Sequence, residues 1–168
     1  MSNRADIELI VNGEFVQESV LVRTNLVDFL RNQLGLTGSH IGCEQGVCGA
    51  CTLEVDGVMI RGCLLLAVQA NGSKITTIEG FSTRSTGRQL QSAFAEHNAL
   101  QCGYCTPGML ATSIEYVEQD GSSDRVSIRE YLSGNYCRCT GYQAIIDAIA
   151  SVIDKSERRN NQSDGLTT

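Results

Sequence analysis

The 168-residue sequence lacks an excess of basic residues, a long apolar run and more than one proline. Its net charge of −6 provides no basic surface to neutralise nucleic-acid phosphates or to bind an anionic membrane. The longest continuous apolar run, Cys63 to Val68, is six residues long, far short of the ~20 that cross a bilayer. One proline beside seventeen glycines fits neither collagen nor a proline-rich linker.

The first six residues are polar and do not contain the apolar stretch of a secretory signal peptide. We therefore expect a cytoplasmic protein, in a compartment that keeps thiols reduced. Under those conditions, eight cysteines in one chain indicate metal ligands before disulfides. A hydrophobic content of 42% excludes a wholly disordered chain, and the length allows one ordinary domain or two small ones.

The first half of the chain has the pattern of a small mixed sheet with one helix packed across it. Asn12-Gly13 and Asp56-Gly57 are tight-turn signals, each lying between short segments of strand-like residues. Leu26, Phe29 and Leu30 share helical spacing, with Thr24 or Asn25 as the cap and Gly35 as the stop. The expected strands are residues 7–11, a return strand beginning at 15–16, then 52–55, 58–60 and 74–78.

The second half has the spacing of several short helices around one core, as in a small bundle. Thr106-Pro107 is typical of a helix start, and apolar residues follow it at helical spacing. Ser127-x-x-Glu130 matches a capping box at another helix start. The apolar stripe from Ile145 to Ile153 predicts a helix that packs into the core rather than one that binds a cofactor.

These patterns predict an α+β protein with two domains. The boundary falls where Ser, Thr and Gly collect, and the last residues are polar. We expect a sheet-rich domain over residues 1–80, a linker over 81–87, a helical domain over 88–157 and a polar tail over 158–168.

Four cysteines in the first half have the ligand spacing of a plant-type [2Fe–2S] cluster: Cys43, Cys48, Cys51 and Cys63. Three thiolates come from one tight loop, which Gly42, Gly46 and Gly49 allow to wrap closely. Because such a cluster is negatively charged, backbone N–H groups should point at its sulfurs. A zinc site more often has two short cysteine pairs, and a disulfide fits this compartment poorly.

The second half carries two close cysteine pairs, Cys102-x2-Cys105 and Cys137-x-Cys139. By themselves, four cysteines in two pairs can form a structural zinc site, and this alternative stays open. The single residue within the second pair is tight for a zinc knuckle, and the neighbouring [2Fe–2S] pattern favours a second cluster. Two clusters in one small chain would form an electron conduit.

Three long motifs now point to a family. Residues 43–51 (CEQGVCGAC), 101–108 (QCGYCTPG) and 137–142 (CRCTGY) together resemble the iron–sulfur subunit of the xanthine oxidase family of molybdenum hydroxylases. The resemblance covers roughly residues 5–155 and matches all eight family cysteines. It implies a plant-ferredoxin-like β-grasp domain followed by a four-helix bundle that carries the second cluster.

The resemblance also implies a role in electron transfer. Electrons would pass from a molybdenum–pterin site through the cluster on Cys102, Cys105, Cys137 and Cys139 to the one on Cys43, Cys48, Cys51 and Cys63, and then to FAD. The pterin contacts of the family fall on Gln101 and Cys139. The chain has no G-x-G-x-x-G fingerprint and is too short for a molybdenum domain, so FAD and molybdenum should lie on partner subunits. We expect a molybdenum-binding large subunit and a FAD-binding medium subunit, in a dimer of heterotrimers that is not catalytic through this chain alone.

Several alternatives remain at this point. The chain could be a freestanding two-cluster redox carrier, or a zinc-stabilised interaction module. Arg138 could offset cluster charge or face solvent, and Tyr104 and Tyr142 could only shield the clusters, whereas His40 and His97 are expected to be ordinary polar positions. The sequence is similar to bacterial members that hydroxylate N-heteroaromatic rings such as quinoline, while carbon monoxide, aldehydes and other heterocycles stay open as substrates.

Overall fold

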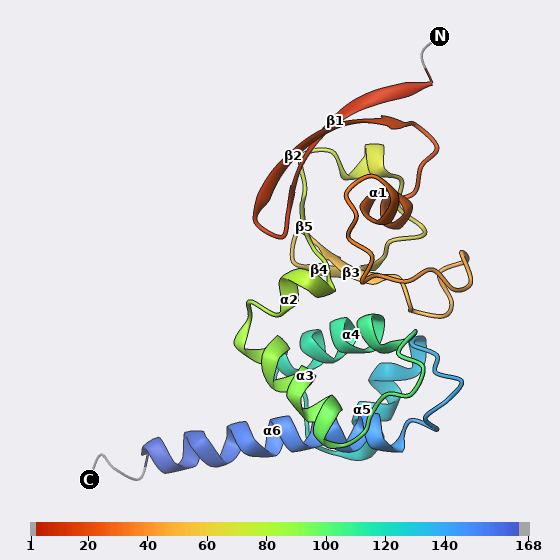
Figure 1. Cartoon of the computed structure of the whole chain (residues 1–168). Helices are drawn as coiled ribbons and strands as arrows, with labels where there is room; N and C mark the ends of the chain where they lie inside the picture. The colour runs from red at the N-terminus through yellow and green to blue at the C-terminus, as the bar shows by residue number, and fades with distance from the viewer. Residues whose placement is uncertain (1–2, 165–168) are drawn as a thin grey trace.

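A five-stranded mixed sheet forms the first half of the molecule (Figure 1). The computed structural model describes residues 3–164, without the side chains of residue 157 and residues 159–164. The strand order is β2-β1-β5-β3-β4, in which β1 is parallel to β5 and every other neighbouring pair is antiparallel. The strands are β1 (Arg4–Val11), β2 (Glu14–Leu21), β3 (Thr52–Val55), β4 (Val58–Arg61) and β5 (Lys74–Thr76).

Both hairpins predicted from the sequence are present. Asn12 and Asp56 have φ angles of 53° and 50°, and the glycine after each has a φ of 90° and 82°. Those left-handed pairs are the backbone that a two-residue hairpin needs, since its twist matches that of the flanking strands. The predicted alternation also holds, because Ile7, Leu9 and Val11 are buried.

The predicted helix of the first half is α1 (Leu26–Asn32), whose apolar side is completely buried. Asn25 is its cap, because its side-chain oxygen accepts a hydrogen bond from the Asp28 amide at 2.8 Å. The last strand is shorter than expected: β5 ends at Thr76, and residue 78 begins the helix α2 (Ile78–Phe81). A separate core joins α1 to the sheet and contains Ile7, Leu9, Val11, Val20, Leu26, Phe29, Leu30, Leu53, Ala67, Ala70 and Ile75.

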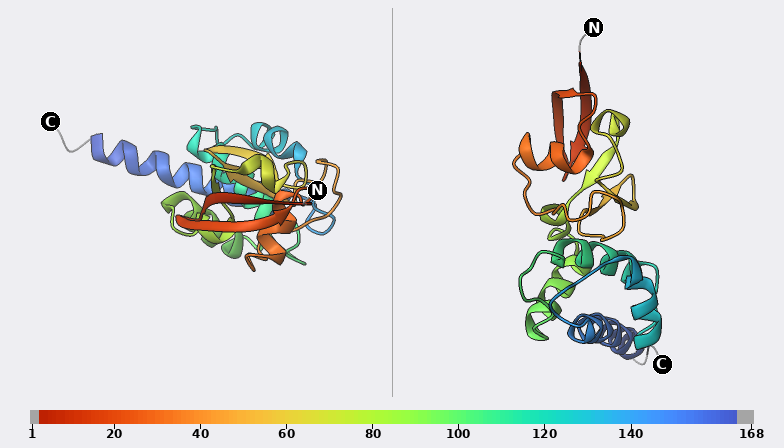
Figure 2. Two further views of the ribbon diagram at one scale, coloured as in Figure 1. Left: turned by 90° about the horizontal axis from the view of Figure 1, so that it is seen from above. Right: turned by 90° about the vertical axis from the view of Figure 1, so that its right-hand side faces the viewer.

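The second half consists of helices that lie below the sheet in Figure 1 and in the right-hand view of Figure 2. They surround a second core, in which the predicted stripe Ile145–Ile153 packs against Leu90, Phe94 and Met109. Within residues 3–164, no helix has the length and apolar character needed to cross a membrane. The helices are α3 (Ser85–Glu96), α4 (Thr106–Glu118), α5 (Arg125–Tyr131) and α6 (Gln143–Asp164), with 3-10 turns at Ala67–Ala70 and Leu132–Gly134.

The predicted capping box at Ser127 is wrong. The helix begins earlier, at Arg125, and the Asp124 carboxylate caps it by accepting from the Ser127 amide at 2.9 Å. Ser127 therefore occupies the third helical position, which the sequence pattern had given to Glu130. Serine and aspartate both cap helices, and the Asp124 carboxylate adds a favourable interaction with the helix dipole.

Helical structure also occupies most of the expected linker and part of the expected tail. Only residues 82–84 lie between α2 and α3. Gly87 of α3 packs closely against the end of α2, since a Cβ at Gly87 would lie 2.1 Å from the Phe81 carbonyl oxygen. Glycine thus lets α3 begin directly against α2. α6 continues through residues 158–164, and residues 165–168 lie outside the described part of the chain.

A bidentate ion pair joins the sheet to the helices. Arg84 donates to both carboxylate oxygens of Glu54 on β3, at 2.5 Å and 2.9 Å. The side chains of Arg84 and Glu54 are 32% and 11% exposed, so the carboxylate is largely removed from water. Since a buried charge without its partner is costly, we expect Arg84→Met to lower the free energy of unfolding by about 3 kcal/mol, measured by chemical denaturation.

The matched control for this prediction is Arg125→Met. Arg125 pairs with Asp147 at 2.9 Å, but the two side chains are 60% and 31% exposed. An exposed pair contributes less than about 1 kcal/mol, so this variant should unfold almost as the wild type does. If Arg84→Met and Arg125→Met lost the same free energy of unfolding, the ion pair between Arg84 and Glu54 would have no special role in joining the domains.

Candidate metal centres

The loop around Cys43 is shaped to hold a thiolate. The amides of Gln45, Val47 and Cys48 point at the Cys43 sulfur from 3.3–3.4 Å. The hydrogen bonds from Cys48 and Gln45 are the main cause that lowers the pKa of the Cys43 thiol to about 6. The loop therefore offers amide hydrogens to a negatively charged sulfur, as the sequence predicted for a cluster site.

Glycines allow this loop its tight path. Gly46 and Gly49 have φ angles of 76° and 74°, which side chains rarely adopt. A Cβ on Gly42 would lie 2.9 Å from the Cys48 sulfur, so the loop backbone runs close to that thiol. The predicted roles of all three glycines are therefore supported by the geometry.

The four thiols of the first set lie close enough to interact with one another. Cys43 interacts with Cys48 through their side chains, and Cys51 interacts in the same way with Cys63. Burial is the main cause that raises the pKa of Cys51 to about 11, and its two cysteine neighbours raise it further. A thiol of this kind becomes a ligand when a metal replaces its proton.

The thiols of the second set also lie close to one another. The sulfurs of Cys102 and Cys139 lie 3.5 Å apart, and Cys105 interacts with Cys137 through their side chains. Burial is the main cause that raises the pKa of Cys105, at the N-terminus of α4, to about 12. Burial is the largest single influence on the Cys137 thiol and acts to raise its pKa, but hydrogen bonds from Thr140, Cys139 and Cys105 together leave that pKa lowered.

Each set consists of four free thiols, and this donor chemistry suits an iron–sulfur cluster. A structural zinc site needs four ligands around one point. A [2Fe–2S] cluster instead distributes four thiolates over two irons, and thiolates are the soft donors that iron–sulfur clusters require.

The two sets meet where the helical domain packs on the sheet domain. The Tyr136 amide, next to Cys137, donates to the Cys48 carbonyl oxygen at 2.9 Å. A cavity of about 160 Å³ opens at this junction. It is lined by Gly42, Cys48 and Ala50 of the first loop and by Cys102, Tyr104, Cys105, Tyr136, Cys137, Arg138 and Cys139.

Buried polar groups hold the junction together. Asn135, only 2% exposed, accepts from the Thr112 hydroxyl at 3.0 Å and donates to the Gly49 carbonyl at 3.3 Å. Arg61 of β4 donates to the Gly134 carbonyl at 2.8 Å. The roles of Asn135, Arg61 and Thr112 could not be predicted from the sequence, because no local pattern reveals partners so distant along the chain.

Two of the residues considered as single candidates form a contact across the junction. His40 stacks on Tyr104 with 4.6 Å between ring centroids, and His40 Nδ1 lies 2.8 Å from the Tyr104 carbonyl oxygen. The Tyr104 hydroxyl donates to the Ile41 carbonyl at 2.6 Å. Tyr104 therefore binds one cysteine segment to the other, a role beyond shielding.

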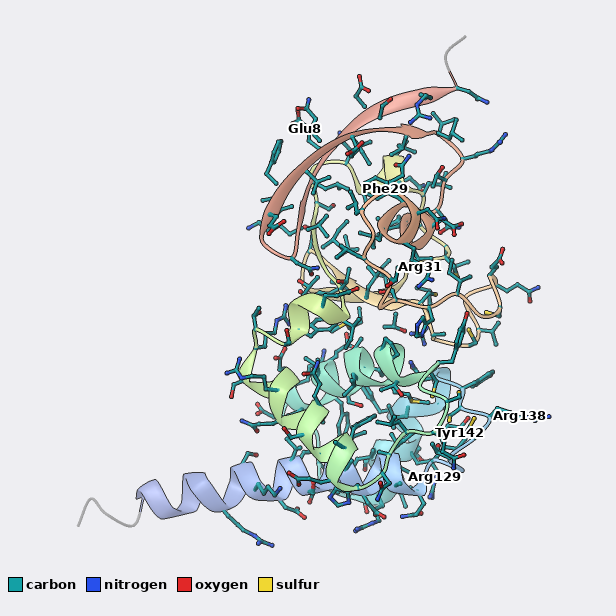
Figure 3. The ribbon with its side chains drawn as sticks, viewed as in Figure 1. Glu8, Phe29, Arg31, Arg129, Arg138 and Tyr142 are labelled. Atoms are coloured by element: carbon teal, nitrogen blue, oxygen red, sulfur yellow. The ribbon has the colours of Figure 1, made fainter. Side chains whose placement is uncertain are left out.

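The remaining candidates lie at the surface or beside it. Gln101 and Cys139, the residues matched to pterin contacts, are both exposed. Arg138 is exposed and points away from the fold, yet it also lines the cavity at the cysteines (Figure 3). His97 is half-buried and directly follows the last residue of α3.

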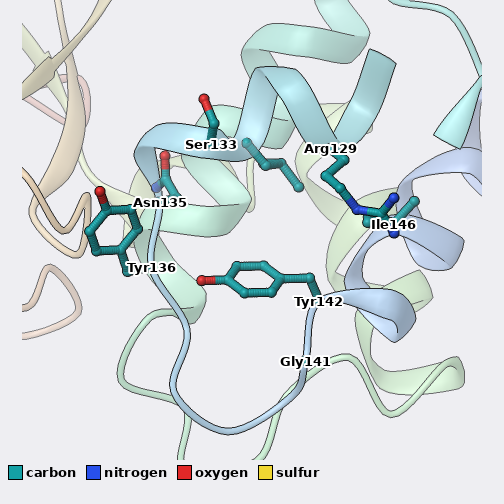
Figure 4. A pocket seen from close by; sticks show the side chains of 8 residues that line it. Arg129, Ser133, Asn135, Tyr136, Gly141, Tyr142 and Ile146 are labelled. Atoms are coloured by element: carbon teal, nitrogen blue, oxygen red, sulfur yellow. The ribbon is translucent and has the colours of Figure 1, made fainter. Parts of the chain in front are cut away.

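A larger cavity of about 250 Å³ lies beside the second cysteine loop and has no cysteine in its lining (Figure 4). The Tyr142 ring forms one wall, and its hydroxyl accepts from the Cys137 amide at 2.9 Å. This cavity is therefore next to the thiol site but is not the place where four sulfurs converge.

Two iron–sulfur families match successive parts of the chain. A 2Fe-2S iron–sulfur cluster binding domain matches residues 9–73, and a [2Fe-2S] binding domain matches residues 77–150. Each match contains one complete set of four cysteines. Together they show that the chain carries two [2Fe–2S] domains in the order expected from the sequence.

Full-length relatives give the same result. The chain is 53% identical to the caffeine dehydrogenase gamma subunit of Pseudomonas sp. (strain CBB1), over 90% of this chain and 92% of that protein. It is 47% identical to the nicotine 6-hydroxylase small subunit of Paenarthrobacter nicotinovorans, over 88% and 89%. A chain in the crystal structure of quinoline 2-oxidoreductase from Pseudomonas putida 86 aligns over 94% of this chain and 98% of its own length, with 48% identity and a TM-score of 0.87. The chain thus belongs to the iron–sulfur subunits of the xanthine oxidase family of molybdenum hydroxylases.

Proposed function

We propose that Cys43, Cys48, Cys51 and Cys63 hold one [2Fe–2S] cluster of this electron-transfer subunit, and that Cys102, Cys105, Cys137 and Cys139 hold the other. The observation that carries this proposal is that the four thiols of each set lie close enough to interact with one another, with the Cys102 and Cys139 sulfurs 3.5 Å apart. When bound, such a cluster accepts and releases a single electron.

The chain's own residues prepare both sites. Amide hydrogens around Cys43 and the Thr140 side chain near Cys137 offset negative charge on the ligand sulfurs. The contact from Tyr136 to Cys48 and the buried Asn135 keep the two sets adjacent. Adjacency matters because electron tunnelling falls steeply with distance.

The proposed domains are a plant-ferredoxin-like β-grasp domain and a four-helix bundle. The mixed sheet with α1 packed across it supports the first, and α3, α4, α5 and α6 around one core support the second. The matches over residues 9–73 and 77–150 support a boundary close to α2.

The proposed partners are a molybdenum-binding large subunit and a FAD-binding medium subunit, in a cytoplasmic dimer of heterotrimers. Relatives named as gamma and small subunits support assembly into such a complex. Gln101 and Cys139 are exposed, so a pterin on a partner can reach them. Relatives named for caffeine, nicotine and quinoline support an N-heteroaromatic substrate, hydroxylated with oxygen from water on the large subunit.

A metal inventory of the purified complex tests this assignment. We expect four iron atoms and four acid-labile sulfides per copy of this chain, together with molybdenum and flavin on two other subunits. Reduction should give two distinct [2Fe–2S] paramagnetic signals, because one thiol set lies in a sheet domain and the other among helices. A colourless, zinc-rich chain would reject the clusters, whereas two clusters in a chain that purifies alone would favour the freestanding carrier.

A further inference from the structure

Thr140 lies in the second cysteine loop, directly after Cys139, and its hydroxyl contacts a sulfur. Thr140 Oγ1 is 3.1 Å from the Cys137 Sγ, and the Thr140 amide nitrogen is 3.5 Å from the same atom. The hydroxyl is thus closer to its sulfur than the three amides that surround Cys43, which lie at 3.3–3.4 Å. Two donors from one residue converge on one thiol.

The surrounding hydrogen bonds determine which way the hydroxyl donates. The Tyr142 amide donates to Thr140 Oγ1 at 3.2 Å, so the oxygen already acts as an acceptor there. A thiolate can only accept, and the hydroxyl hydrogen therefore points at the Cys137 sulfur. Tyr142 has a φ of 69°, and its own hydroxyl accepts from the Cys137 amide at 2.9 Å, which closes the loop from the other side.

We propose that the Thr140 hydroxyl sets the reduction potential of the second cluster by donating a hydrogen bond to the Cys137 ligand sulfur. The proposal rests on the ligand assignment given under the proposed function. Reduction adds one electron and no proton to the cluster, which makes its ligand sulfurs more negative. A donor to such a sulfur stabilises the reduced state more than the oxidised state, and so raises the potential.

Thr140 offers a way to alter one cluster without the other. The donors to Cys43 are backbone amides, which remain when a side chain is replaced. Of the two Thr140 donors to Cys137, the closer one is a side-chain hydroxyl, on a loop of the other domain, and the amide remains when that side chain is replaced. Removing the hydroxyl should therefore change the potential of the second cluster and leave the first cluster as an internal reference.

The test is a redox titration of the intact complex, with dithionite as reductant and ferricyanide as oxidant, followed by EPR. Thr140→Val keeps the shape of the side chain and removes the hydroxyl, whereas Thr140→Ser keeps the hydroxyl. We expect Thr140→Val to make reduction of the second cluster about tenfold less favourable, a midpoint about 59 mV lower for one electron. Thr140→Ser should stay near the wild type, and the first cluster should not move in either variant.

An unchanged second midpoint in Thr140→Val would overturn the proposal, and so would equal shifts of both clusters. If that variant loses the second cluster, Thr140→Ala and Thr140→Ser decide. Loss from Thr140→Ala but a normal midpoint in Thr140→Ser supports a required hydroxyl donor, while loss from both shows that the side chain only holds the loop. The wild-type iron content and its two EPR signals test the ligand assignment separately, since their absence would reject the clusters before any midpoint is compared.

Discussion

Substrate should no longer reduce the flavin in a complex that carries Cys102→Ser, although dithionite still reduces the first cluster. Cys102 is an exposed member of the second thiol set, and serine is a harder and weaker ligand for iron. Replacing a group that only orients a metal ligand already lowers metal affinity or activity by up to about a hundredfold. We therefore expect substrate-driven flavin reduction to fall by at least that factor, measured by rapid mixing.

Cys43→Ser is the matched variant on the other thiol set. Substrate should still reduce the molybdenum and the second cluster there, and only the flavin should be reduced slowly. The two thiol sets lie in domains with separate cores, so each substitution should leave the other set folded. At low temperature the second cluster should be the one that couples magnetically to Mo(V). Stronger coupling of the first cluster would reverse the proposed order.

A second large effect is expected from Gly108→Ala on α4. A Cβ at this position would lie 2.0 Å from the Gly49 carbonyl oxygen and 3.2 Å from the Ala50 Cα. Both atoms belong to the backbone of the first cysteine loop, so no side chain can move aside. Either α4 or the loop must shift, and overpacking of this kind costs about 3 kcal/mol. Thermal unfolding should show the loss, and the magnetic coupling between the two clusters should weaken.

Gly13→Ala is the control for this substitution. Gly13 has a φ of 90°, but a Cβ there meets no atom within 4 Å. Gly13→Ala therefore introduces backbone strain alone and should lower the free energy of unfolding by about 1 kcal/mol. The magnetic coupling between the clusters should stay unchanged. If the two variants lose similar stability and keep the same coupling, α4 does not position the loop.

The features that sequence analysis predicted well depend on neighbouring residues. The turns at Asn12-Gly13 and Asp56-Gly57 need only left-handed backbone at two positions, and Asn25 caps a helix three residues away. The stripe Ile145–Ile153 repeats within one helix and is buried. The cysteine spacing behind the proposed first cluster is equally local, because Cys43, Cys48 and Cys51 share one loop.

The interactions that sequence analysis missed join distant parts of the chain. Asn135 and Gly49 are 86 residues apart, and Arg61 and Gly134 are 73 apart. Their meeting depends on how one domain packs on the other, which no local periodicity encodes. The helix start at Asp124 was missed for a different reason: two adjacent patterns both fit a cap, and only the fold selects between them.

The separation of the two cores has a consequence for how the protein is made in the cell. The buried residues of the sheet domain and of the helices form distinct clusters, and polar contacts such as Asn135 to Gly49 connect the domains. Each thiol set is complete within its own domain, so we expect each domain to be able to receive iron and sulfide independently of the other. A chain with a single centre would then be an assembly intermediate. Only docking of the loops around Cys48 and Tyr136 requires both domains to be finished.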